Sequence, residues 1–95
     1  MKMVLMYADT ASLPAVRDDL VALGAPGYSV IPVVEGCGRT GIHTGDRVHP
    51  GALALVMVIA EDAVADRVFE EMTKRRDAHG DEMSRLFLVP VERQA

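Results

Sequence analysis

The sequence has few aromatic residues and a single cysteine, and each scarcity limits the kind of protein that it encodes. Two tyrosines, two phenylalanines and no tryptophan occur among 95 residues, so the core has to be built from aliphatic side chains. One cysteine cannot form an intramolecular disulfide, which is typical of proteins in a reducing compartment. We therefore expect an aliphatic core and a cytoplasmic location.

The sequence also lacks an excess of positive charge and a long hydrophobic segment. Its formal net charge of −4 disfavours nucleic-acid binding, which normally requires a basic surface. The apolar run at residues 3–8 ends at Asp9 and is too short for a signal peptide or a membrane span. The sequence therefore predicts no nucleic-acid partner and no membrane insertion. A hydrophobic content of 49% and a length of 95 residues predict one globular domain over residues 1–95.

The first third of the chain predicts a strand followed by a helix. Residues 3–8 have the apolar character of a strand, and the next apolar residues recur at helical spacing, namely Leu13, Val16, Leu20 and Leu23. Ser12 is expected to cap this helix, with Pro14 in its first turn, where no backbone N–H is needed. Gly24 stands where a helix of this length needs a C-terminal cap.

Two more strands follow, and they differ in character. Residues 28–35 are rich in β-branched side chains, but Pro32 restricts that strand to a sheet edge or a bulge. Residues 52–60 are apolar without interruption, so both faces of that strand need to be buried. The second of these strands is therefore expected in the middle of the sheet.

The last third of the chain predicts a second helix and a final strand. Asp62 is a candidate cap for the helix, and its apolar face is formed by Val64, Val68 and Met72, with Ala65 and Phe69 beside them. On its other side the spacing predicts ion pairs between Glu70 and Lys74 and between Glu71 and Arg75. Residues 85–91 are expected to form the last strand.

The resulting order, β-α-β-β-α-β, predicts the ferredoxin-like α+β fold, a four-stranded antiparallel sheet with both helices on one face. Alternate residues of 52–60 would then point at the face without helices. Leaving a residue such as Leu53, Leu55 or Met57 in water would forgo about 1.5–3 kcal/mol for each side chain. We therefore expect other copies of the chain to cover that face in an obligate homo-oligomer.

A glycine-rich segment, residues 35–51, joins the second and third predicted strands and contains five of the eight glycines. Residues 36–41 match G-x-G-x-x-G, but no helical pattern follows, so the segment is not a dinucleotide-binding turn of the Rossmann type. Its glycines would still let backbone N–H groups approach an anion, with Arg39 supplying charge. Two other hypotheses are a metal site formed by Cys37, His43 and His49, and an acid–base pair of Asp46 with either histidine.

Several segments of the sequence occur in the order found in one known family. They are Val16-Arg17, Gly24, residues 27–30, residues 34–39 with their G-x-G-R sequence, His43-Thr44 and residues 85–91. The chain resembles the PII signalling family in its short-loop, PII-like branch, over nearly its whole length. The resemblance implies a ferredoxin-like fold, a compact homotrimer with the open sheet faces turned inward, and adenine nucleotides bound in clefts between subunits.

The resemblance also implies which residues bind the nucleotide. Ser29 matches a hydroxyl residue near the base, Gly36, Cys37 and Gly38 match the backbone that lines the pocket, and Arg39 matches a phosphate-facing arginine. Residues 79–81, with Gly80 at their centre, match a second phosphate-binding loop. Arg85 stands where a lysine usually contacts phosphate.

The long loop, about residues 36–50, is expected to be flexible and to dock on an enzyme, a transporter or a regulator. The residues expected to contact that partner are Thr40, Gly41, His43, Asp46 and Arg47. The loop is shorter than in the nitrogen regulators and lacks their modifiable tyrosine, and the chain lacks two C-terminal phosphate-binding arginines. Fewer cations stabilise a triphosphate less, so ADP, AMP, another small anion or a metal is as plausible a ligand as ATP.

The leading hypothesis is therefore a trimeric PII-like regulatory protein with no enzymatic activity. The alternative within the same architecture is a metal-binding protein resembling the CutA-like trimers and using Cys37, His43 and His49. A small ferredoxin-like enzyme is the third hypothesis, and it would need a substrate cavity between the sheet and the helices.

Overall fold

The computed structural model describes residues 1–38, 41–43, 53–79 and 85–95. In chain order its elements are β1 (Lys2–Asp9), a 3₁₀ turn (Thr10–Ser12), α1 (Leu13–Ala22), β2 (Ser29–Pro32), β3 (Gly36–Gly38), β4 (Gly41–His43), β5 (Leu53–Ala60), α2 (Asp62–His79) and β6 (Leu86–Pro90). No helix in the described ranges is long and apolar enough to cross a membrane.

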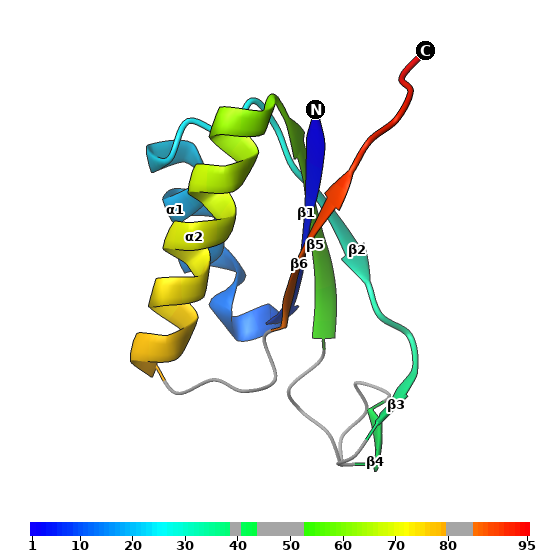
Figure 1. The fold of residues 1–95 in the computed structure, drawn as a ribbon. Coiled ribbons are helices and arrows are strands. Elements are labelled where there is room, and N and C mark those ends of the chain that lie inside the picture. The colour runs from blue at the N-terminus through cyan, green and yellow to red at the C-terminus, as the bar shows by residue number, and fades with distance from the viewer. Residues whose placement is uncertain (39–40, 44–52, 80–84) are drawn as a thin grey trace.

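Four of these strands form one antiparallel sheet in the order β2-β5-β1-β6. Both helices lie on the same side of the sheet, as Figure 1 shows. The ferredoxin-like prediction is therefore confirmed. Pro32, which lacks a backbone N–H, lies on the edge strand β2, as the sequence predicts, and the apolar strand β5 lies between β2 and β1.

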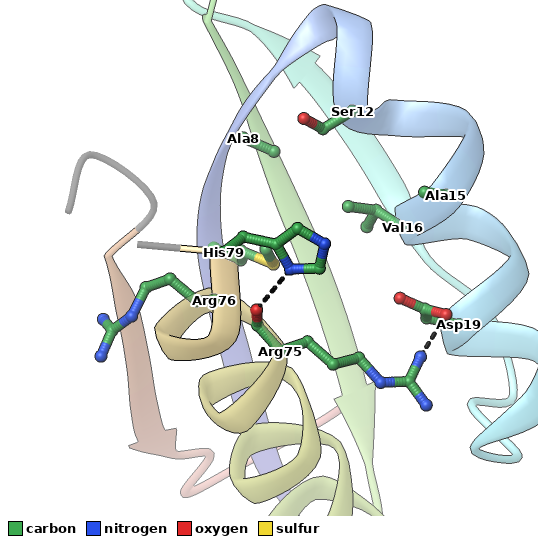
Figure 2. Close-up of a pocket in the computed structure, with 9 residues that line it drawn as sticks. Ala8, Ser12, Ala15, Val16, Asp19, Arg75, Arg76 and His79 are labelled. Carbon is green, nitrogen blue, oxygen red and sulfur yellow. Dashed lines mark hydrogen bonds and ion pairs between the residues drawn. The ribbon is translucent and has the colours of Figure 1, made fainter. Parts of the chain in front are cut away.

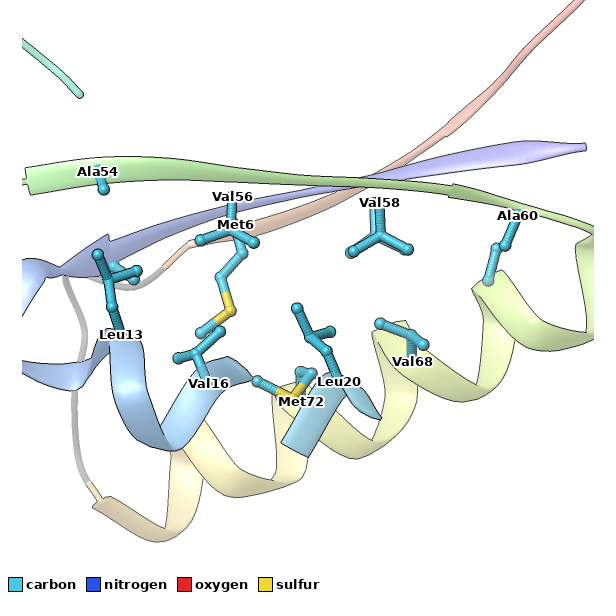
Figure 3. Close-up of a cluster of buried hydrophobic side chains, with 13 residues drawn as sticks. Met6, Leu13, Val16, Leu20, Ala54, Val56, Val58, Ala60, Val68 and Met72 are labelled. Carbon is cyan, nitrogen blue, oxygen red and sulfur yellow. The ribbon is translucent and has the colours of Figure 1, made fainter. Parts of the chain in front are cut away.

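The core lies between the sheet and the two helices (Figure 3). Alternate residues of β1 and β5 point to it, and in β5 these are Ala54, Val56, Val58 and Ala60. The helices contribute Leu13, Val16 and Leu20 from α1 and Ala65, Val68 and Met72 from α2. All buried residues in the described ranges are aliphatic or methionine, as the shortage of aromatic residues predicts.

The beginning of α1 differs from the prediction in one respect. Pro14 is in the first turn as expected, but the Ser12 side chain makes no capping hydrogen bond. The Ser12 backbone already has helical dihedral angles, φ −87° and ψ −10°, whereas an N-cap residue normally has an extended backbone. A 3₁₀ turn over Thr10–Ser12 leads into the helix instead, and the Leu13 N–H donates to the Thr10 carbonyl.

The ion pairs of α2 also differ from the prediction. Arg75 pairs with Asp19 of α1 instead of Glu71, and Lys74 contacts Glu71 at 3.2 Å, three residues away instead of four. The prediction for Arg75 was wrong because it considered only neighbours on the same helix. The packing of α1 beside α2 offers Arg75 a carboxylate on the other helix.

The end of α1 is formed by Gly24, as predicted. Its φ of 82° is in the left-handed region that favours glycine, and the Ala25 N–H donates to the Leu20 carbonyl at 3.0 Å. The Leu23 carbonyl accepts hydrogen bonds from Arg67 Nε at 3.2 Å and from Nη2 at 3.1 Å. The turn after α1 is thereby attached to α2.

Replacing Gly24 by alanine is expected to destabilise the protein by about 1 kcal/mol, because a β-carbon is unfavourable at positive φ. Gly27→Ala is the matched control, since φ there is not positive and no atom lies within 4 Å of an added β-carbon. The free energy of unfolding, measured by urea denaturation, should fall only for the Gly24 variant. Equal stability of the two variants would contradict the assignment of Gly24 as the helix cap.

Truncating Val68, which is 0% exposed, to alanine is expected to cost about 2 kcal/mol of unfolding free energy. The reason is lost apolar burial together with the cavity left behind. Val21, also helical but 71% exposed, gives the matched control Val21→Ala, for which a change within about 0.5 kcal/mol is expected. Similar losses in the two variants would show that α2 does not form the core as described.

Candidate ligand-binding site

The sheet face without helices carries a continuous layer of large apolar side chains. On β1, Leu5 lies opposite Met57 of β5 and Phe87 of β6, and Tyr7 lies opposite Leu55. Residues directly opposite in an antiparallel sheet share a face, so these side chains form one surface. Phe87 is 46% exposed, and Ile31 and Ile59 are 44% and 42% exposed. In the single chain this surface, called the open face below, is in contact with solvent.

Two of the predicted ligand residues lie at opposite edges of this sheet. Ser29 begins β2 and lies opposite Met57 of β5. Arg85 directly precedes β6, and its carbonyl accepts a hydrogen bond of 3.0 Å from the Tyr7 N–H. Because β5 and β1 separate β2 from β6, three interstrand spacings, or about 14 Å, lie between the two edges. One chain therefore does not bring Ser29 and Arg85 together.

Three further predicted residues, Gly36, Cys37 and Gly38, form β3, which pairs with β4 in a two-stranded ribbon. The ribbon lies beyond the end of the main sheet (Figure 1). Within the predicted loop, about residues 36–50, the segments 36–38 and 41–43 thus pair as strands. Pairing satisfies the backbone donors and acceptors that a glycine-rich sequence would otherwise expose to water.

Only some of the remaining predicted residues lie within the described part of the chain. Gly41 and His43 belong to β4, where the backbone of His43 lies opposite that of Gly36. Arg39, Thr40, Asp46, Arg47, His49 and Gly80 lie outside the described residues. Cys37 is an exposed, free cysteine, and the described ranges contain no group of three His, Cys, Asp or Glu residues arranged to hold a metal ion. The metal hypothesis therefore has no support among the described residues.

Among the described residues, the ionisable groups with shifted pKa values lie where β1 begins, close to the beginning of α2. Lys2 Nζ donates to Asp66 Oδ1 at 2.8 Å, and this hydrogen bond raises the pKa of Lys2. The amino group of Met1 contacts Asp62 Oδ1 at 2.7 Å, which lowers the pKa of the Asp62 carboxyl. Lys2 lies opposite Ala60, at the end of the sheet where β5 ends. The ribbon lies near the other end, where β5 begins at Leu53, opposite Asp9 (Figure 1). These ion pairs therefore attach β1 to α2 and belong to the scaffold.

The structure also contains a feature for which the sequence carries no recognisable signal. A cavity of about 170 Å³ lies between α1, β1 and the last turn of α2 (Figure 2). Two of the residues that line it, Asp19 and Arg75, form the ion pair between the helices. Its lining residues come from segments far apart in the sequence, so only the packing of the helices creates it.

Fold and site together define a class of protein: a ferredoxin-like domain with one apolar, helix-free sheet face and a glycine-rich ribbon extending from an edge strand. The family model described as "Nitrogen regulatory protein P-II" matches residues 1–95. The chain belongs to this family, as the resemblance in the sequence indicates. Among curated proteins none matches the chain.

Solved structures with the same fold include PII-like proteins. CPII, a nitrogen regulatory PII-like protein from Thiomonas intermedia K12 bound to ADP, AMP and bicarbonate, is 20% identical, with a TM-score of 0.73 over 97% of this chain and 88% of that chain. A putative PII-like signalling protein from Thermus thermophilus is 18% identical, with a TM-score of 0.63 over 92% and 78% of the two chains. At these identities the likeness shows the shared fold.

Proposed function

We propose that this chain is a PII-like regulatory protein that binds an adenine nucleotide or a similar small anion between subunits and signals to a partner protein through residues 36–50. The observation that carries the proposal is the position of Ser29 and Arg85 at opposite edges of one sheet. If both contact one ligand, a neighbouring copy of the chain has to supply one of them. Binding of a ligand shared in this way would depend on how the subunits are arranged.

The open face supports association of the chain with itself. Scattered apolar residues on a protein surface are ordinary, but a continuous apolar layer is typical of an interface. Leu5, Met57 and Phe87 lie in one row across three strands of this layer. The resemblance to PII-like proteins supports three as the number of subunits.

The choice of ligand is supported by relatives and by charge. Structures of CPII were obtained with ADP, AMP and bicarbonate, and with ADP and bicarbonate. In this chain Arg39 and Arg85 are the cations proposed to contact phosphate, and a guanidinium donates two parallel hydrogen bonds to an oxyanion. With only two cations, more of the charge of a triphosphate than of a diphosphate or monophosphate would remain without a partner in the site. We therefore propose ADP or AMP ahead of ATP.

The output of the proposed protein is a conformation, and no chemical reaction is required of it. Between β2 and the ribbon, the Val33 N–H donates to the Leu53 carbonyl at 3.0 Å, and Val34 beyond it is 82% exposed. Gly36–Gly38, proposed to line the ligand pocket, lie in the same ribbon as Gly41 and His43, proposed to face the partner. Ligand binding and partner binding would thus depend on one short element.

Replacing Phe87 by glutamate is expected to convert the trimer into monomers, because a carboxylate would be buried in the apolar layer without a partner. Sedimentation velocity and native mass spectrometry at micromolar concentration measure the subunit number. Val21→Glu, at an exposed position of α1 on the helix side, is the control and should leave a trimer. A monomeric wild-type protein, or a Phe87 variant that remains trimeric, would contradict the proposed interface.

Replacing Arg39 or Arg85 by alanine is expected to weaken ADP binding at least tenfold, or about 1.4 kcal/mol, through loss of a charged phosphate contact. Isothermal titration calorimetry with ADP, AMP and ATP measures the affinities. Arg17→Ala, at an exposed position of α1, is the matched control and should bind as the wild type does.

The monomeric Phe87→Glu variant should also lose nucleotide binding if the site is shared between subunits. Retention of ADP binding by that monomer would place the site within one chain. Absence of binding of all three nucleotides to the wild-type trimer would refute the proposed ligand class while leaving the trimer intact.

A further inference from the structure

The cavity between the two helices has an apolar floor and a polar wall (Figure 2). Met6 and Ala8 of β1 and Val16 of α1 belong to the hydrophobic core and provide apolar contacts. Ser12 lies at one side, and Arg75 and His79 of α2 lie at the other. Apolar walls with a few polar groups are typical of sites for small molecules.

The histidine presents one definite polar atom to this cavity. His79 Nδ1 lies 2.7 Å from the Arg75 carbonyl oxygen, which can only accept, so Nδ1 carries the proton. In the neutral ring Nε2 is then a hydrogen-bond acceptor. Figure 2 shows this second nitrogen on the side of the ring that faces α1. A ligand in the cavity can therefore donate a hydrogen bond to Nε2.

The charged side chains around the cavity balance one another. Arg75 pairs with Asp19 across the gap between the helices, and Arg76 Nη2 contacts Asp77 Oδ1 at 2.9 Å. Each guanidinium thus has a carboxylate beside it, and the helix C-terminus at His79 adds partial negative charge. The lining therefore favours an uncharged ligand over an anion.

The size of the cavity limits the ligand further. A volume of about 170 Å³ has room for a molecule of about the size of benzene, and the space opens to solvent, because Ser12, Ala15 and His79 in its lining are exposed. The Ser12 hydroxyl, which makes no capping hydrogen bond to α1, offers a second polar contact. We propose that this cavity binds a small uncharged molecule of the phenol class, with an apolar ring on Met6, Ala8 and Val16 and a hydroxyl that donates to His79 Nε2.

This cavity lies on the helix side of the sheet, and it shares one residue, His79, with the segment 79–81 that is expected to contact phosphate. Met6 and Ala8 point to the helix side of the sheet, whereas the open face lies on the other side. Association through the open face would leave the cavity accessible. The inference is argued from the cavity alone and does not require that the protein binds a nucleotide.

The test compares three probes of similar size: phenol, toluene and benzoate. Chemical-shift changes of backbone amides in the wild-type protein, followed by titration in ¹H–¹⁵N spectra, give the site and the affinity. Phenol should bind saturably, with shifts centred on Ala15, Val16 and His79. Toluene should bind about tenfold more weakly, since it lacks the hydrogen bond, and benzoate more weakly still.

Two variants locate the site. Ala15→Leu should fill the cavity and abolish phenol binding, whereas Ala22→Leu, also exposed on α1 but not lining the cavity, should leave it unchanged. His79→Ala should reduce the affinity for phenol to that for toluene.

Three outcomes would overturn the inference. Absence of saturable phenol binding would show that the cavity is not a site, and tighter binding of benzoate would show an anion site instead. Equal phenol binding by the Ala15 and Ala22 variants would place the ligand elsewhere. None of these results depends on whether the protein binds ADP.

Discussion

The central constraint on this structure is that β5 is apolar on both of its faces. Its helix-facing residues are small, Ala54, Val56, Val58 and Ala60, and its outward residues are larger, Leu53, Leu55, Met57 and Ile59. Small side chains let the helices pack closely on one face, and Ala65 of α2 is completely buried there. The larger side chains remain partly exposed on the other face. The chain therefore forms one hydrophobic core between the sheet and the helices, and its open face offers a second apolar layer that another chain could cover.

The arrangement of the candidate ligand residues follows from the same sheet. The order β2-β5-β1-β6 puts the two chain segments with candidate ligand residues, the start of β2 and the start of β6, at the two edges. An edge strand is where one chain can meet another, because its outer backbone groups are unpaired within the sheet. In the proposed function, association through the open face and ligand binding at the edges are therefore two consequences of one geometry.

The helix side of the sheet carries the cavity proposed to bind a small uncharged molecule. Small residues, Ala8 on β1 and Ala15 on α1, occur where α1 begins, and the cavity lies beside them. The ion pair of Arg75 with Asp19 joins the helices next to this space. A bound molecule there would contact both helices, whereas a nucleotide at the edges would contact the sheet and the ribbon.

Local sequence determined most of the fold. The apolar runs of β1 and β5 and the helical spacing of Val64, Val68 and Met72 are patterns within short segments of the sequence. Pro32 and Gly24 act through their own backbone geometry. The resemblance to PII-like proteins supplied the identities of the candidate ligand residues. Tertiary structure alone decided that Arg75 pairs with Asp19. The 3₁₀ turn before α1 and the pairing of residues 36–38 with 41–43 are local, but the sequence patterns did not indicate them. Tertiary structure also decided that Ser29 and Arg85 lie at opposite edges and that a cavity opens between the helices, because both depend on contacts between residues distant in sequence, which no local pattern encodes.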